Sequence, residues 1–305
     1  MTTDVDQRTA ARLRGDHVPL GIAYMVGATL MFAGSQALSK WQVASYTVPE
    51  VLFFRSIASL AICSVLILPR TGLAVFRTAR LSAHVGRNVV QAGSQSLILI
   101  ALSLMPLAGA IAINFSAPLF AALFAALWLH ERIGRARGLA LLVGFLGVLL
   151  VASPGADSFN IGAIFALGNA VLYGSVTAAV RGLSATESTE TLTMYQMVWL
   201  TVFFAAAMPM VGITWPPNAD WAALVFNGVL NGLGQYWWTR ALSLAPPAAV
   251  GPFYYFSLVW AMMLGFLVWG DLPTLTLLAG SAIVVASGLY LLWHESGKKA
   301  PPVTE

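Results

Sequence analysis

The chain has 305 residues, of which 58% are apolar and only 9% are charged, and its mean hydropathy is +0.79. A soluble domain carries about 25% charged residues, so this composition excludes an ordinary soluble protein and indicates a polytopic membrane protein. The net charge of +4 does not indicate nucleic-acid binding, because the basic residues are spread over alternate loops rather than gathered in one patch.

Ten apolar stretches are long enough to cross a hydrocarbon layer about 30 Å thick, which needs about 20 helical residues. They cover residues 19–39, 49–68, 82–104, 107–129, 134–152, 159–180, 190–212, 220–243, 247–269 and 273–293. Thirteen lysines and arginines lie on one side of these spans, and only Lys40 lies on the other. Since basic loops stay in the cytoplasm, we predict an all-α membrane protein with two cytoplasmic tails, residues 1–18 and 294–305.

Two halves of the chain repeat each other at an offset of 140 residues. The run Ala101-Leu-Ser-Leu-Met-Pro106 matches Ala241-Leu-Ser-Leu-Ala-Pro246, and the repeats are expected to cover residues 19–153 and 159–293. Each repeat has five spans, an odd number, so the second copy enters the membrane upside down relative to the first. Inverted repeats are characteristic of secondary transporters, which bind their substrate near the midplane where the repeats meet.

Polar side chains recur every four residues along one face of two spans that this offset relates. They are Arg87, Gln91 and Gln95 in the span 82–104, with Asn88 beside them, and Asn227, Asn231 and Gln235 in the span 220–243. Such stripes can be hydrogen-bonding groups that join helices. Six large polar groups exceed what packing needs, so we interpret the stripes as the lining of a substrate cavity.

Other polar and aromatic residues inside spans, or at the ends of spans, are further candidates for substrate contact. They are Gln36 and Lys40 in the first span, Asn114 in the fourth, Asn169 and Tyr173 in the sixth, and Tyr254 and Tyr255 in the ninth. At least one of the two adjacent tyrosines is expected to face the cavity, because both lie too deep for an interfacial belt.

Several of these features also have a structural interpretation. Lys40 can extend its ammonium to the outer interface. Arg55, about 9 Å deep by the rise of a helix, can pair with Glu50 or with helix-end carbonyls. Pro118 and Pro252 can be simple kinks, or they can free carbonyl groups for a gate or a ligand. These alternatives remain open on the sequence alone.

Four segments resemble the EamA repeat of the drug/metabolite transporter superfamily. They are Pro49 followed by Arg55, Leu104-x-Pro106-x-Ala108, Ala117-Pro118-Leu-Phe, and Leu129-x-Glu131-Arg132 ahead of a glycine-rich helix. Within that superfamily the chain is most similar to bacterial aromatic amino acid exporters. The second copy departs from the pattern with Tyr195, Leu258 and Asp271 at the arginine, proline and glutamate positions. The resemblance implies ten helices around a central cavity and export of small metabolites across the inner membrane of a bacterium.

We therefore predict a monomeric exporter of small neutral metabolites, including aromatic and other apolar amino acids, that works by alternating access. No enzyme, cofactor or metal site is expected, because the four histidines lie at or beyond span ends and no catalytic or metal-ligand spacing occurs. All 12 acidic residues lie in tails, loops or near span ends, which favours facilitated transport. The alternatives are an exporter of other small drugs or metabolites that is coupled to a proton or cation gradient, and a receptor or scaffold that transports nothing.

Overall fold

The computed structural model describes residues 18–128, 135–152, 161–184, 186–212, 215–245 and 247–296. Within these ranges every regular element is a helix and no strand occurs. The predicted all-α class is therefore confirmed for this part of the chain. Most of the two expected tails, and the motif Leu129-His130-Glu131 at and just beyond the end of the fourth predicted span, lie outside the described residues.

Helical segments coincide with all ten predicted spans. In the first half they are α2 (Val18–Gln42), α3 (Val48–Thr71), η1 (Gly72–Phe76), α4 (Leu81–Leu104), α5 (Leu107–Asn114), α6 (Ala117–Trp128) and α7 (Arg135–Ala152). In the second half they are α8 (Ile161–Leu183), α9 (Thr189–Val211), α10 (Trp221–Leu244), α11 (Pro247–Val250), η2 (Gly251–Tyr255), α12 (Phe256–Trp269) and α13 (Leu275–Ser296).

Local side chains explain where several helices begin and end. At the start of α3, Glu50 accepts hydrogen bonds from the backbone and hydroxyl of Thr47, both at 2.8 Å. At the start of α9, the hydroxyl of Ser188 accepts from the backbone nitrogen of Thr191 at 3.1 Å. Helix α12 ends at Trp269 and is capped by Gly270, whose φ of 72° is a left-handed conformation that glycine adopts without steric cost.

Two of the predicted spans are interrupted at proline. Helix α5 ends at Asn114 and α6 begins at Ala117, one residue before Pro118. In the second half, Pro252 lies in the short 3₁₀-helix η2, which separates α11 from α12. Proline lacks a backbone N–H and its ring clashes with the preceding turn, so a regular α-helix does not continue across either position. A gating role for these breaks stays a prediction.

Within the described ranges, five helical segments are long and apolar enough to cross a membrane, judged by length and composition. They are Val18–Gln42, Val48–Phe76, Ile161–Val180, Thr189–Val211 and Pro252–Trp269. Helices α4 and α10 are not among those found in the described residues, and their polar stripes lower their mean hydropathy. The crossing of the membrane by all ten predicted spans, and their inverted orientation, stay predictions.

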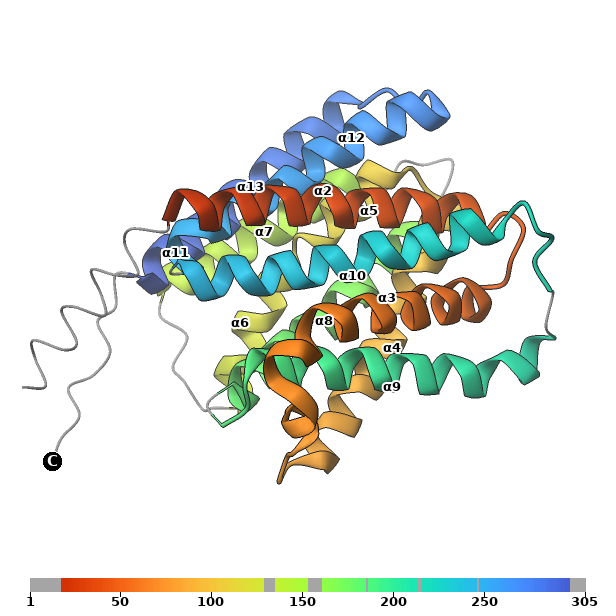
Figure 1. The fold of residues 1–305 in the computed structure, drawn as a ribbon. Coiled ribbons are helices and arrows are strands. Elements are labelled where there is room, and N and C mark those ends of the chain that lie inside the picture. Colours follow the sequence, from red (N-terminus) through yellow and green to blue (C-terminus); the bar gives the residue numbers. More distant parts are fainter. Residues whose placement is uncertain are drawn as a thin grey trace, which may run out of the picture.

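Helices from the two halves lie side by side (Figure 1). The most extensive helix contacts include α2 with α10, α4 with α8 and α7 with α13, and each of these pairs joins the first half of the chain to the second. The α7–α13 pair packs closely through Gly147 and Gly280, as expected for helices rich in small residues. Helices α9 and α10 begin at opposite ends of the molecule. The interior between the halves includes the buried polar residues Gln91, Ser94 and Asn227.

Candidate substrate cavity

A cavity of about 110 Å³ is lined by residues of α2, α3, α4, α5, α8, α9, α10 and η2. Nine of the twelve predicted substrate-binding residues line it, namely Gln36, Gln91, Gln95, Asn114, Asn169, Tyr173, Asn231, Gln235 and Tyr254. No aspartate or glutamate is found among the described residues of its wall. The cavity therefore combines amide groups from both halves of the chain with phenol groups.

Arg55 on α3 lines the cavity with only 4% of its surface exposed. Its Nη2 donates to Oε1 of Gln95 at 2.5 Å, and its Nη1 donates to the hydroxyl of Ser39 at 3.3 Å. These partners lie on α4 and α2, so the guanidinium links three helices. The sequence suggested only a structural role for Arg55, and the structure adds a place on the cavity wall.

The stripe on α10 divides between the cavity and the packing of helices. Asn231 and Gln235 line the cavity, and Nδ2 of Asn231 donates to the hydroxyl of Ser59 at 2.9 Å. Asn227 is completely buried and bonds three side chains of α2 over 2.6–2.9 Å, namely Ser35, Ser39 and Gln42. One end of the stripe therefore joins helices, as the structural interpretation proposed, while the rest faces the cavity.

The stripe on α4 divides in the same way. Gln91 and Gln95 line the cavity, whereas Arg87 and Asn88 do not belong to its wall. The Nη2 of Arg87 donates to the carbonyl of Leu192 at 3.0 Å, and Nδ2 of Asn88 donates to the carbonyl of Tyr195 at 3.4 Å. The structure thus places Asn88, a predicted substrate contact, between α4 and α9, because it lies one turn nearer the start of α4 than the cavity.

Three helices meet at a chain of amide groups beside the cavity. Asn169 on α8 accepts a hydrogen bond at Oδ1 from Ser94 of α4, at 2.7 Å, and donates from Nδ2 to Oδ1 of Asn114, also at 2.7 Å. Asn114 is the last residue of α5, so the helix break before Pro118 leaves this side chain at the cavity wall. Tyr173 lies one turn beyond Asn169 on α8 and lines the same cavity.

The two adjacent tyrosines of η2 both contact Phe115 but differ in their other surroundings. Tyr254 lines the cavity and meets the ring of Phe115 edge to face, with ring centres 5.7 Å apart. Tyr255 also contacts Phe115, at 4.9 Å, but its hydroxyl packs against Gly288 of α13, where a Cβ atom would overlap it. Tyr254 is therefore the cavity residue of the pair, and Tyr255 packs between helices.

Lys40 is not part of the cavity wall. Its ammonium donates to the carbonyls of Leu102 and Met105, each at 2.7 Å, and lies 5.4 Å from the ring centre of Trp269. Carbonyl groups at the end of α4 lack partners within the helix, and the negative end of the helix dipole favours a cation there. The structure thus places this predicted substrate contact at the end of a helix, where it stabilises the carbonyls and the neighbouring ring.

Besides Arg55, seven further wall residues were not predicted. They are the polar Ser56, Ser94 and Gln196 and the apolar Phe32, Ile98, Met197 and Leu200. Gln196 carried a usable signal, since it is a large amide in an otherwise apolar part of the span 190–212. The apolar four carried none, because an apolar residue on a membrane helix can face lipid, another helix or a cavity with equal ease.

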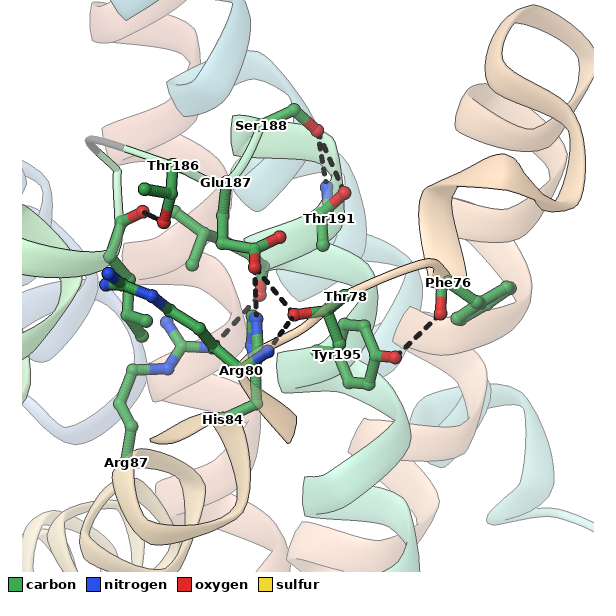
Figure 2. A network of polar contacts seen from close by, with 12 residues as sticks. Phe76, Thr78, Arg80, His84, Arg87, Thr186, Glu187, Ser188, Thr191 and Tyr195 are labelled. Atoms are coloured by element: carbon green, nitrogen blue, oxygen red, sulfur yellow. Dashed lines mark hydrogen bonds and ion pairs between the residues drawn. The ribbon is translucent and has the colours of Figure 1, made fainter. Parts of the chain in front are cut away.

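A network of polar and aromatic contacts joins the starts of α4 and α9 (Figure 2). Glu187 accepts a hydrogen bond from the hydroxyl of Thr78 at 2.6 Å and lies 3.9 Å from Nε2 of His84. The ring of His84 stacks on Tyr195 with centres 4.4 Å apart, and the hydroxyl of Tyr195 donates to the carbonyl of Phe76 at 2.8 Å. We call these five residues the α4–α9 network. It connects the segment after α3 to the loop before α9.

Comparisons with known proteins agree on one family. A profile of the EamA-like transporter family matches residues 19–153 and 160–293. The riboflavin transporter of Vibrio cholerae is 31% identical to this chain over 92% of it and 96% of the relative. The pseudopaline exporter CntI of Pseudomonas aeruginosa is 31% identical over 92% of this chain and 99% of the relative. Neither relative is named for aromatic amino acids, the substrates that the sequence resemblance suggested.

A solved structure, described as the crystal structure of a protein, shares the fold with a TM-score of 0.64 at 21% identity. The alignment covers 91% of this chain and 99% of that one. The similarity in fold therefore extends over nearly the whole of both chains.

Proposed function

Because the chain belongs to the EamA-like transporter family and is a membrane transporter, we propose that it exports small neutral metabolites, above all amino acids with aromatic or apolar side chains. The observation that carries this proposal is a cavity lined by amide and phenol groups from both halves, with no acidic residue in its described wall. Amides donate and accept hydrogen bonds, so they suit a zwitterion whose charges cancel.

The cavity also suits an apolar side chain on the substrate. Phe32, Ile98, Met197 and Leu200 supply apolar surface, and Tyr254 supplies a ring. Pockets that enclose drug-sized ligands have volumes of about 300–1,000 Å³, so about 110 Å³ favours a small substrate. A larger substrate requires the helices to separate, as they do when a transporter changes between its two states.

The proposal includes the arrangement in the membrane. Ten spans form two inverted five-helix repeats, residues 19–153 and 159–293, in the inner membrane of a bacterium with both termini in the cytoplasm. The protein works as a monomer and moves substrate down its own gradient, because no acidic residue is expected deep in the membrane to relay protons. The support for this arrangement is the offset of 140 residues and the pairing of helices across the two halves.

Transport by the purified full-length protein in proteoliposomes tests the function. We expect labelled L-phenylalanine to equilibrate through the wild type, and Gln91→Leu with Gln235→Leu to lower the rate at least about tenfold, since both amides line the cavity. The melting temperature of the double variant in detergent serves as the control for folding. Unchanged transport would assign the amides to packing. Accumulation against an imposed pH or sodium gradient would contradict facilitated transport.

A flavin is the second candidate substrate, and the riboflavin transporter of Vibrio cholerae is the observation that favours it. The ring system of riboflavin carries no net charge and offers hydrogen-bonding groups that match amides, while its flat face suits the ring of Tyr254. The same proteoliposomes decide between the two candidates. Uptake of riboflavin in the absence of any uptake of L-phenylalanine would replace the amino acid proposal.

A further inference from the structure

Arg55 is the one charged residue among the described residues that line the cavity. The two hydrogen bonds described for its guanidinium reach neutral groups, the amide oxygen of Gln95 and the hydroxyl of Ser39. The acidic residue nearest to it along α3 is Glu50, which binds Thr47 at the start of the helix. The cavity wall thus presents a positive charge with neutral groups around it.

Burying a cation inside a membrane protein is unfavourable unless an opposite charge or several hydrogen bonds offset the loss of water. An anionic group that enters the cavity supplies that opposite charge. The guanidinium is planar and presents paired N–H groups that match the two oxygens of a carboxylate. Gln95 fixes the orientation of this group through its short bond to Nη2.

A second observation points to the other end of the same ligand. The Oε1 atom of Gln36 is buried and has no hydrogen-bond partner in the described structure, although Gln36 lines the cavity. A buried acceptor without a donor costs about 1–3 kcal/mol. A ligand with an N–H group removes that cost when it binds, so the wall offers one place for an anion and another for a donor.

We propose that Arg55, oriented by Gln95, is the anion subsite of this cavity and binds a carboxylate, while Gln36 accepts a hydrogen bond from an amine of the same molecule. The inference rests on the proposed transport function and narrows the substrate class to carboxylates with a neighbouring amine, as in an α-amino acid. Riboflavin, which has no carboxylate, does not use this subsite.

The first experiment needs no knowledge of the natural substrate. A single cysteine is introduced by Gln36→Cys in a Cys63→Ala background, and its rates of reaction with anionic methanethiosulfonate ethylsulfonate and cationic methanethiosulfonate ethyltrimethylammonium are compared in proteoliposomes. We expect Arg55→Gln to lower the anion-to-cation rate ratio about tenfold or more, the lower end of electrostatic focusing in clefts. Any change in the reactivity of the thiol itself cancels in the ratio.

Arg87→Gln is the matched control. Arg87 is 5% exposed against 4% for Arg55, but it does not belong to the cavity wall, so the ratio should not change. A ratio that Arg55→Gln leaves unchanged would overturn the anion subsite and leave the transport proposal intact. Reaction with neither reagent would contradict an accessible cavity and therefore both proposals.

The second experiment uses the wild type alone, so it does not depend on the folding of a variant. Uptake of L-phenylalanine is compared with uptake of L-phenylalaninamide, in which a neutral carboxamide replaces the carboxylate. We expect the amide to be transported at least about tenfold more slowly, since one charge-assisted pair is lost. Equal uptake of the two would overturn the anion subsite while transport stands. Uptake of neither would reject the amino acid proposal and this inference with it.

Discussion

The α3–α10 contact and the α4–α9 contact involve positions that the offset of 140 residues relates, yet their side chains differ. Between α3 and α10, Gly228 lies so close to α3 that a Cβ atom would overlap Ala58 and lie 2.7 Å from the carbonyl oxygen of Arg55. The hydroxyl of Ser59 donates to the carbonyl of Gly228 at 2.9 Å. Small residues thus bring the two backbones together.

The α4–α9 contact has large side chains at the corresponding positions. Asn88 replaces Gly228, and Trp199 replaces Ser59. The indole nitrogen of Trp199 is buried and has no hydrogen-bond partner in the described structure, and its ring stacks on Phe203 with centres 5.4 Å apart. The α4–α9 network supplies further contacts through Glu187, His84 and Tyr195 (Figure 2).

A loop also stabilises the end of the molecule where α10 begins. The hydroxyl of Tyr46, between α2 and α3, donates to Oδ2 of Asp220 at 2.5 Å, and this hydrogen bond raises the pKa of Tyr46 to about 12. The comparison teaches that duplicated helices need not make equivalent contacts. Glycine allows backbone contact that resists separation, whereas side-chain contacts can break one at a time. We expect α4 and α9 to separate first in the transport cycle.

The largest expected effect concerns two asparagines that are both completely buried. Asn227→Ala removes three hydrogen bonds of 2.6–2.9 Å between α10 and α2. Each buried group left without a partner costs about 1–3 kcal/mol, so we expect the free energy of unfolding to fall by about 3 kcal/mol or more. Asn88→Ala removes only bonds of 3.3 and 3.4 Å and should cost about 1 kcal/mol. The melting temperatures of the two variants in detergent measure this difference. An equal loss of stability in both would contradict the larger effect expected at Asn227.

The next effect tests backbone contact by making one substitution at two glycines. Gly228→Ala forces α3 and α10 apart and should cost about 1–3 kcal/mol, as overpacking does elsewhere. Gly86→Ala on α4 is the matched control, because a Cβ atom added there would meet no neighbouring group within 4 Å in the described part of the chain. There alanine should stabilise the helix by up to about 1 kcal/mol. The melting temperatures of the two variants measure these effects. A shift in the same direction for both would contradict the close contact of α3 and α10 at Gly228.

A smaller effect is expected from removing one carboxylate charge at each contact. Glu187→Gln weakens the α4–α9 network, and Asp220→Asn weakens the bond to Tyr46. A loss of about 1 kcal/mol is the upper range for a single ion pair, and it corresponds to about a fivefold change in the equilibrium between the closed and the open contact. We expect Glu187→Gln to raise the labelling rate of a cysteine at Gln196, in a Cys63→Ala background, by about that factor.

Asp220→Asn is the control for this experiment, because the glycine contact between α3 and α10 remains in place. It should change the labelling rate at position 196 less than about twofold, within the small effects typical of surface charges. A larger increase for Asp220→Asn than for Glu187→Gln would reverse the assignment of the contact that opens. Gln196 lines the cavity from α9, so its labelling reports access to the cavity itself.

The mildest substitutions test which side of the membrane each contact faces. Leu73, in η1, and Trp215, before α10, are 76% and 75% exposed, so cysteine at either position should change neither fold nor transport. In whole cells with Cys63→Ala, an impermeant maleimide should label Trp215→Cys and not Leu73→Cys. This result would place the α4–α9 network on the cytoplasmic side. Labelling of Leu73→Cys alone would invert the topology.

Most of the fold followed from local patterns. The predicted span 49–68 became α3, Val48–Thr71, and the difference of three residues at its end arises because Pro69 did not stop the helix before Gly72. The family resemblance is confirmed across both halves. Stripes of period four predicted which faces of α4 and α10 are polar, because one helix turn decides which residues share a face. Four members of those stripes line the cavity.

The sequence by itself determined the class of protein, the positions of the helices and the two polar faces, since hydropathy and spacing are properties of each segment alone. Only the tertiary structure decided which polar groups face the cavity. Asn227 and Asn231 are one turn apart, but α2 covers the first and the cavity adjoins the second. Tyr254 and Tyr255 are adjacent, yet α13 covers only one hydroxyl. A residue's surroundings depend on the neighbouring helix, and the local sequence does not specify that neighbour.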